Sequence, residues 1–211
     1  MKKSLLLLAF LIVSIYQTDA STIVLSASAA GRAVFDSSSV TPMPNGNIIQ
    51  IGHFSSPNSL SLSQTSVQAI LTAGGWSQFG GNLLTSSIFA TSGKVKGTDT
   101  DDSAAATSFN NQSVYVMVFN APTTLGATQL GIFRATAGTP VWTFPTNGFG
   151  FGDSVTLNMD DITLTSVNGV GSVVGTVMRT AAFASAPEPT SATLLMIGLV
   201  SLASRRRRQG K

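Results

Sequence analysis

The chain of 211 residues contains no cysteine, one histidine and one glutamate, and only 10% of its residues are charged. The absence of cysteine excludes disulfides and thiol chemistry, and together with the single histidine it disfavours a zinc site. Any Ser-His-Asp triad would depend on His53, which lies in an apolar stretch and is therefore expected to be structural. Because Glu188 lies close to the C-terminus, carboxylate catalysis elsewhere in the chain would rely on aspartates.

The formal net charge of +3 and the sequence pI of about 9.6 come from the two ends of the chain. Residues 21–186 contain five basic and seven acidic side chains, so this region has a formal charge of −2. These residues are Arg32, Lys94, Lys96, Arg134 and Arg179, and Asp36, Asp99, Asp101, Asp102, Asp153, Asp160 and Asp161. A slightly acidic region gives no electrostatic reason to expect binding to DNA or RNA.

Residues 1–20 have the pattern of a secretory signal peptide. Lys2 and Lys3 precede the apolar run Leu5–Ile15, and Thr18-Asp19-Ala20 then offers a small residue at its last position and a tolerable one two before it. We expect cleavage after Ala20, which leaves Ser21 as the mature N-terminus. An uncleaved membrane anchor is the alternative reading of the same segment.

The C-terminal end has three parts in a fixed order. Residues 183–190 form a linker that carries Pro187, Glu188 and Pro189, and residues 191–204 form an apolar run. The basic tail, residues 205–211, begins with Arg205, Arg206, Arg207 and Arg208. The run up to Ser204 is about 15 residues, or roughly 22 Å as a helix, whereas a bilayer core of about 30 Å usually needs about 20 residues. This predicts a short transmembrane helix whose arginines stay on the cytoplasmic side.

This ordered tail resembles the PEP-CTERM sorting signal of exopolysaccharide-producing Gram-negative bacteria. The resemblance covers the two ends of the chain: the signal peptide, the Pro187-Glu188-Pro189 motif, the apolar run and the arginine block. It implies that exosortase, a membrane protease-transpeptidase, acts near the motif. It also implies transit through the inner membrane, followed by release to the cell surface or the extracellular matrix.

Residues 21–182 are predicted to form an all-β passenger domain, a β-sandwich or jelly-roll-like fold with one short helix. The region is rich in Ser, Thr, Gly, Asn and Val, and its strand-like segments alternate with turn residues. The expected strands are Thr22–Ser26, Ile48–Phe54, Ser113–Phe119, Gln129–Arg134, Pro140–Phe144, Ser154–Leu157, Ile162–Ser166 and Val173–Ala181. Ser113–Phe119 is apolar almost throughout, which predicts a central strand. The expected helix is Gln64–Ala73, with Gly74 and Gly75 at its C-terminal end.

The polar stretch Lys94–Asn111 is predicted to be a long loop. Asp99, Asp101 and Asp102 cluster hard oxygen ligands in it, which suits calcium in principle. The stretch lacks the glycine and distal glutamate of an EF-hand, so a solvated acidic loop is the preferred reading.

We therefore expect a structural or interaction protein of the cell surface or matrix, with no enzymatic activity and no cofactor. The expected partners are exosortase during sorting and then exopolysaccharide or other surface proteins. The first alternative is a carbohydrate-binding module that uses Trp76 or Trp142 as an exposed aromatic face. The second is a glycoside hydrolase, which requires Asp153, Asp160 or Asp161 to converge in a pocket.

Overall fold

The computed structural model describes residues 21–28, 30–38, 42–64, 66–88, 91–101, 109–137, 142–145 and 154–183. Ala20, the Pro187-Glu188-Pro189 motif, the expected transmembrane helix 191–204 and the arginine block lie outside these residues. Within the described ranges, no helix has the length and apolar character needed to cross a membrane.

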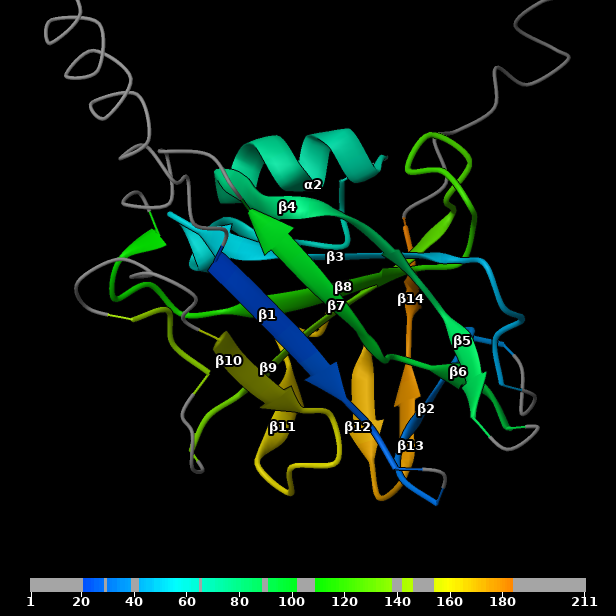
Figure 1. The fold of residues 1–211 in the computed structure, drawn as a ribbon. Helices are drawn as coiled ribbons and strands as arrows, with labels where there is room; N and C mark the ends of the chain where they lie inside the picture. Colours follow the sequence, from blue (N-terminus) through cyan, green and yellow to red (C-terminus); the bar gives the residue numbers. More distant parts are fainter. Residues whose placement is uncertain are drawn as a thin grey trace, which may run out of the picture.

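The described part of the chain is mostly β, with several sheets and one α-helix (Figure 1). The largest sheet has the strand order β11-β9-β8-β3-β4, and β14 also pairs with β9. Its strands are β3 (Ile48–Phe54), β4 (Trp76–Leu84), β8 (Tyr115–Phe119), β9 (Gln129–Ala135), β11 (Leu164–Ser166) and β14 (Ala181–Ala182). We call it the central sheet.

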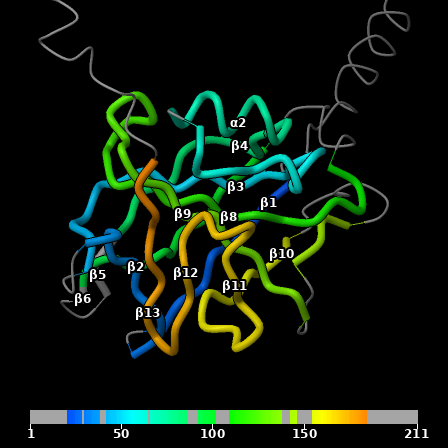
Figure 2. Tube along the Cα trace, turned by 180° about the vertical axis from the view of Figure 1, so that it is seen from behind, coloured from blue at the N-terminus to red at the C-terminus, as the bar shows by residue number. Residues whose placement is uncertain are grey.

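Three smaller sheets surround the central sheet. The front sheet, in the order β10-β1-β7, consists of β1 (Ser21–Ser26), β7 (Gly97–Asp101) and β10 (Ser154–Asn158). The others consist of β2 (Ala33–Phe35) with β12 (Ser172–Val174) and β13 (Val177–Arg179), and of β5 (Ser86–Ile88) with β6 (Thr91–Lys94). Figure 2 shows the β12–β13 hairpin and β11 on the side away from the front sheet.

The inner strands β3 and β8 are buried on both faces, which explains their nearly continuous apolar sequences. On one face, Ile49 and Ile51 share a hydrophobic cluster with Ile23 and Leu25 of the front sheet. On the other face, Met117 and its neighbours pack with the helix α2 (Val67–Gly74). The front sheet and α2 therefore lie on opposite sides of the central sheet (Figure 1).

The helix α2 has a conventional cap at each end. The Ser66 hydroxyl accepts a hydrogen bond from the Ala69 backbone N–H at 3.2 Å, and Gly75 ends the helix in the left-handed conformation with φ 62°. A 3₁₀ helix, η1 (Pro57–Ser59), precedes it. The helix confirms the expectation for Gln64–Ala73, although it starts three residues later. Because Trp76 follows Gly75 directly, β4 begins beside the C-terminal end of α2.

Three expectations about strands are wrong. The predicted loop Lys94–Asn111 contains β7 over Gly97–Asp101, which pairs with β1. The predicted single strand Val173–Ala181 is a hairpin followed by a separate strand, because Gly175 turns the chain with φ 57°. Of the predicted strand Pro140–Phe144, the described residues 142–144 form only an isolated bridge between Thr143 and Ser113.

Candidate functional site

A glutamine interrupts the apolar sequence of β3. Ile49 and Ile51 point to the core under the front sheet, whereas Ile48 and Phe54 pack on the α2 face. Side chains alternate along a strand, so Gln50 lies on the α2 face, where it is only 6% exposed. A buried polar side chain at this position needs partners that the apolar core cannot supply.

Because β4 pairs antiparallel with β3, Trp76 lies opposite Phe54, and it lines the same pocket as Gln50. The indole ring packs on Phe54 with centroids 4.6 Å apart. It also covers Gly52, where an added Cβ would lie 2.8 Å from two carbons of the ring and 2.1 Å from the Ser77 carbonyl oxygen. The missing side chain at Gly52 is therefore what allows the half-buried ring to lie against β3.

These residues line a pocket of about 400 Å³ between α2, the start of β4 and the loop that joins β8 to β9. Its volume falls within the range of small-ligand pockets, about 300–1,000 Å³. The lining residues are Gln50, Gln68, Leu71, Thr72, Gly75, Trp76, Gln78 and Thr124. Every polar group among them is an amide, a hydroxyl, an indole N–H or a backbone group, so the lining carries no formal charge. We call this cavity the glutamine pocket.

Amide hydrogen bonds hold the floor of the glutamine pocket. Gln50 Nε2 donates to Asn82 Oδ1 at 2.9 Å, and Gln78 Nε2 donates to the Gly81 carbonyl at 2.6 Å. Two buried polar atoms have no protein partner: Gln50 Oε1, an acceptor, and Trp76 Nε1, a donor. The pocket floor therefore has one unused acceptor and one unused donor, and burial makes each of them costly to leave unpaired.

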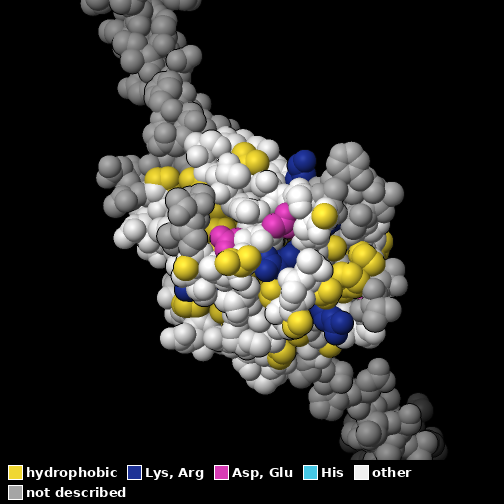
Figure 3. Space-filling view, turned by 90° about the horizontal axis from the view of Figure 1, so that it is seen from below, with side chains coloured by type: hydrophobic (Ala, Val, Ile, Leu, Met, Phe, Trp, Pro, Cys, Tyr) yellow, Lys and Arg dark blue, Asp and Glu magenta, His cyan; other side chains and the backbone are white. Residues whose placement is uncertain are grey.

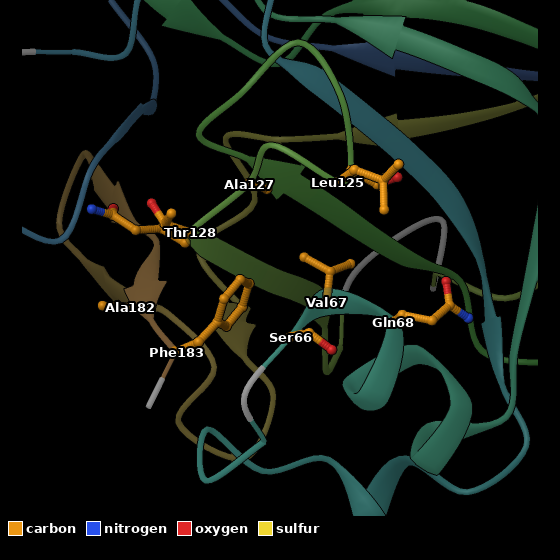
Figure 4. A pocket seen from close by; sticks show the side chains of 10 residues that line it. Ser66, Val67, Gln68, Leu125, Ala127, Thr128, Ala182 and Phe183 are labelled. Carbon is orange, nitrogen blue, oxygen red and sulfur yellow. The ribbon is translucent and has the colours of Figure 1, made fainter. Parts of the chain in front are cut away.

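A second cavity of about 400 Å³ adjoins the glutamine pocket, since Gln68 and Thr124 line both. It lies between the N-terminal end of α2 and the end of β14, and its lining includes Val67, Leu125 and Phe183. Figure 4 shows the side chains of Val67 and Phe183 near each other, with Leu125 on the loop above them. The two cavities therefore border each other, and the lining of the glutamine pocket is the more polar of the two.

The structure rules out Trp142 as the exposed aromatic face of the carbohydrate-binding alternative and agrees with the preferred interpretation, core packing. Its side chain is 2% exposed and belongs to the core cluster between the central and front sheets. The segment 142–145 runs beside the start of β8, where the Val114 N–H donates to the Trp142 carbonyl at 3.0 Å. Of the two tryptophans, only Trp76 lines a described pocket.

The acidic cluster Asp99–Asp102 is predicted to lie in a loop, but Asp99 to Asp101 belong to the strand β7. Asp102 lies outside the described residues. Asp99 is 6% exposed, and its Oδ1 accepts from the backbone N–H groups of Gly81 and Thr100. Burial raises the pKa of Asp99, and the nearby Asp101 adds to this effect, although the two hydrogen bonds oppose it. Among the described residues, no group of three metal-ligating side chains is found.

The aspartates of the hydrolase alternative serve local structure where they are described. Asp160 accepts hydrogen bonds from the backbone N–H groups of Ser28 and Arg32, each at 2.7 Å. Burial alone would raise the pKa of Asp160, but these hydrogen bonds and the charge of Lys94 outweigh it and keep the pKa below its usual value. Asp161 Oδ1 accepts from the N–H and hydroxyl of Thr163. Asp153 lies outside the described residues.

His53 lies on the core side of β3. It is 9% exposed, and its ring meets Phe109 edge-on with centroids 5.2 Å apart. Burial lowers its pKa, which favours the neutral imidazole. These surroundings are those of a packed core side chain.

The described surface has few charges, in keeping with the sequence. On the face turned away from α2, acidic and basic side chains lie among uncharged ones (Figure 3).

Comparison with protein families, with curated proteins and with solved structures finds no match. Sequence reasoning identified Trp76 as a candidate but missed Gln50, although a glutamine inside an apolar strand was a visible signal.

Proposed function

We propose that this chain is an exported structural or interaction protein of the bacterial cell surface or extracellular matrix. The observation that carries the proposal is the ordered C-terminal tail: Pro187-Glu188-Pro189, then a short apolar run, then four arginines. A signal peptide at the other end directs the residues between them out of the cytoplasm. Exosortase acts near the motif and separates the passenger from its transmembrane helix.

The position of Ser21 is compatible with this route. Ser21 is the first residue of β1, so cleavage after Ala20 removes no residue of that strand. The finer fold we propose for the passenger is a β-sandwich, in which the central and front sheets enclose the main core. A packed β domain with few charges suits a passive role in a surface layer or matrix.

Terminal-peptide and intact-mass spectrometry of the native protein from fractionated cells tests the proposal. We expect a species that starts at Ser21, ends near Pro187 and is found outside the inner membrane. A variant with alanine at 187, 188 and 189 should keep its arginines and stay in the membrane fraction. If the unmodified protein keeps Arg205–Arg208 in the membrane fraction, the processing step is wrong and the protein is a membrane-tethered domain.

A second candidate function, carbohydrate binding, is favoured by one observation: the uncharged glutamine pocket beside Trp76. The hydrolase alternative has no comparable support, because Asp160 and Asp161 accept hydrogen bonds that fix neighbouring loop segments. We therefore do not propose an enzymatic role.

A further inference from the structure

We propose that the glutamine pocket binds a neutral saccharide, with Trp76 Nε1 as hydrogen-bond donor and Gln50 Oε1 as acceptor to its hydroxyl groups. This inference names a partner for the proposed surface function and rests on that function only for the source of the sugar. The pocket chemistry itself does not depend on how the chain is delivered.

Gln50 and Trp76, which both line the pocket, each have one buried atom without a partner. Leaving a buried donor or acceptor unpaired costs about 1–3 kcal/mol, and both Gln50 Oε1 and Trp76 Nε1 are in this state. A hydroxyl group donates one hydrogen bond and accepts others, so it can satisfy either atom. A molecule with several hydroxyls on a rigid ring can satisfy both at once.

The walls of the pocket are polar but uncharged. The lining has three glutamines, two threonines and an indole, and no acidic or basic side chain. A charged ligand would lose hydration without finding an opposite charge. A wholly apolar ligand would leave Gln50 Oε1 and Trp76 Nε1 without partners. A neutral polyhydroxylated ring avoids both penalties, and its C–H faces can contact Leu71 and the edge of Trp76.

Access to the floor requires a small rearrangement. In the described conformation neither Gln50 Oε1 nor Trp76 Nε1 is reached by solvent. Gln68 on the rim is exposed and donates a long hydrogen bond, 3.4 Å, to Thr72. A ligand therefore reaches these atoms only after side chains of the lining rotate, and exposed side chains such as Gln68 rotate within nanoseconds.

The adjoining apolar cavity predicts a preference for oligosaccharides. Because Gln68 and Thr124 line both cavities, a chain of sugar rings can extend from the glutamine pocket towards Val67 and Phe183. Sugar rings present apolar C–H faces as well as hydroxyls, and aromatic side chains can pack against the former. We therefore expect a neutral oligosaccharide to bind more tightly than its monosaccharide.

The two tryptophans allow a direct test, since each can be left as the single tryptophan fluorophore of the chain. The full-length chain is purified in a detergent without a sugar headgroup and screened against an array of neutral, acidic and amino oligosaccharides. The best neutral ligand is then titrated into Trp142→Phe, which keeps Trp76, and into Trp76→Phe, which keeps Trp142. We expect the fluorescence to change only in Trp142→Phe.

Calorimetry with the same ligand gives the second readout. Trp76→Phe and Gln50→Met should each weaken binding about tenfold, because the first removes the Nε1 donor and the second removes the amide that carries the Oε1 acceptor. Ile162→Ser, at an exposed position outside the pocket lining, should leave the affinity unchanged. If Trp142→Phe does not fold, the comparison of Gln50→Met with the unmodified chain decides the question.

Three results would overturn the proposal: no neutral saccharide on the array binds, only charged saccharides bind, or Trp76→Phe and Gln50→Met bind like the unmodified chain. These results leave the sorting proposal untouched, because mass spectrometry tests it separately. Conversely, if the protein keeps its C-terminal tail but binds the saccharide, only the proposed processing step is wrong.

Discussion

Trp76 and Trp142 show how much the surroundings of a single residue depend on the tertiary fold. Both lie near glycine or proline in the sequence, which makes each a candidate for an exposed ring, although core packing is the preferred interpretation for both. Trp76 follows the cap of α2 and lies over Gly52, where it borders a pocket. Trp142 is 2% exposed in the core between two sheets. Local sequence does not separate them because the deciding contacts come from other strands.

The burial of Asp99 leads to a prediction, also at the scale of a single residue, about how stability depends on pH. Its folded-state pKa is raised, mainly by burial, so the stability linked to this group is present at low pH and is lost as pH rises through the folded pKa. Asp99→Asn removes the charge but keeps an Oδ1 acceptor for Gly81 and Thr100. We expect its free energy of unfolding to exceed that of the unmodified protein by about 1 kcal/mol at pH 7.

Urea unfolding at pH 7 and pH 3 checks this expectation. The difference between Asp99→Asn and the unmodified protein should shrink at pH 3, where Asp99 is protonated. Asp36→Asn is the control, because Asp36 is less buried and its Oδ1 accepts from the N–H and hydroxyl of Ser38, two residues away. A variant at position 99 that is equally or less stable at pH 7 would contradict the assigned effect of burial.

At the scale of elements, a continuous apolar run correctly predicts a strand here, whereas a polar sequence does not reliably predict a loop. The apolar run at Ser113–Phe119 correctly predicts a central strand, because β8 lies between β9 and β3. The Thr- and Asp-rich composition of β7 predicts a loop, and this prediction is wrong. Thr98 and Thr100 face solvent while Asp99 faces inward, so the usual alternation is present with polar residues on both faces.

The N-terminal cap of α2 gives a prediction for an element. Ser66→Ala removes the acceptor for the Ala69 N–H and should lower the free energy of unfolding by about 1 kcal/mol. Ser66→Asp is the matched control, because its carboxylate can cap the same N–H and suits the positive end of the helix dipole. Chemical denaturation of the three proteins measures the effect. Equal stability of Ser66→Ala and the unmodified protein would show that the cap contributes little.

At the scale of the whole molecule, buried charged groups connect segments that are distant in the sequence. Arg32 donates to the carbonyl oxygens of Gly175, Met159 and Asp161. Lys94, on β6, is fully buried and donates to the carbonyl oxygens of Gly31 and Arg32. These bonds join β6, the β1–β2 connection and the turns after β10 and β12.

Replacement of Lys94 tests this connection. Lys94→Met keeps a similar length but leaves the Gly31 and Arg32 carbonyl oxygens without the Nζ donor. We expect the free energy of unfolding to fall by roughly 2 kcal/mol. Lys96→Met, two residues further along and exposed, should change it by less than about 0.5 kcal/mol. Equal effects of the two substitutions in denaturant unfolding would rule out a special role for the buried lysine.

Local composition and residue order were enough to predict several features of the molecule. Strand-forming composition indicates a mostly β protein, the apolar run of β8 indicates a central strand, and helix periodicity indicates α2. The proposed export route also rests on sequence alone, because charge and hydrophobic length at the termini are local properties. The burial of particular polar and aromatic residues, in contrast, depends on the packed fold. Gln50 lines a pocket, Asp99 faces inward and Trp142 enters the core because each is placed by pairing with strands far away in the chain.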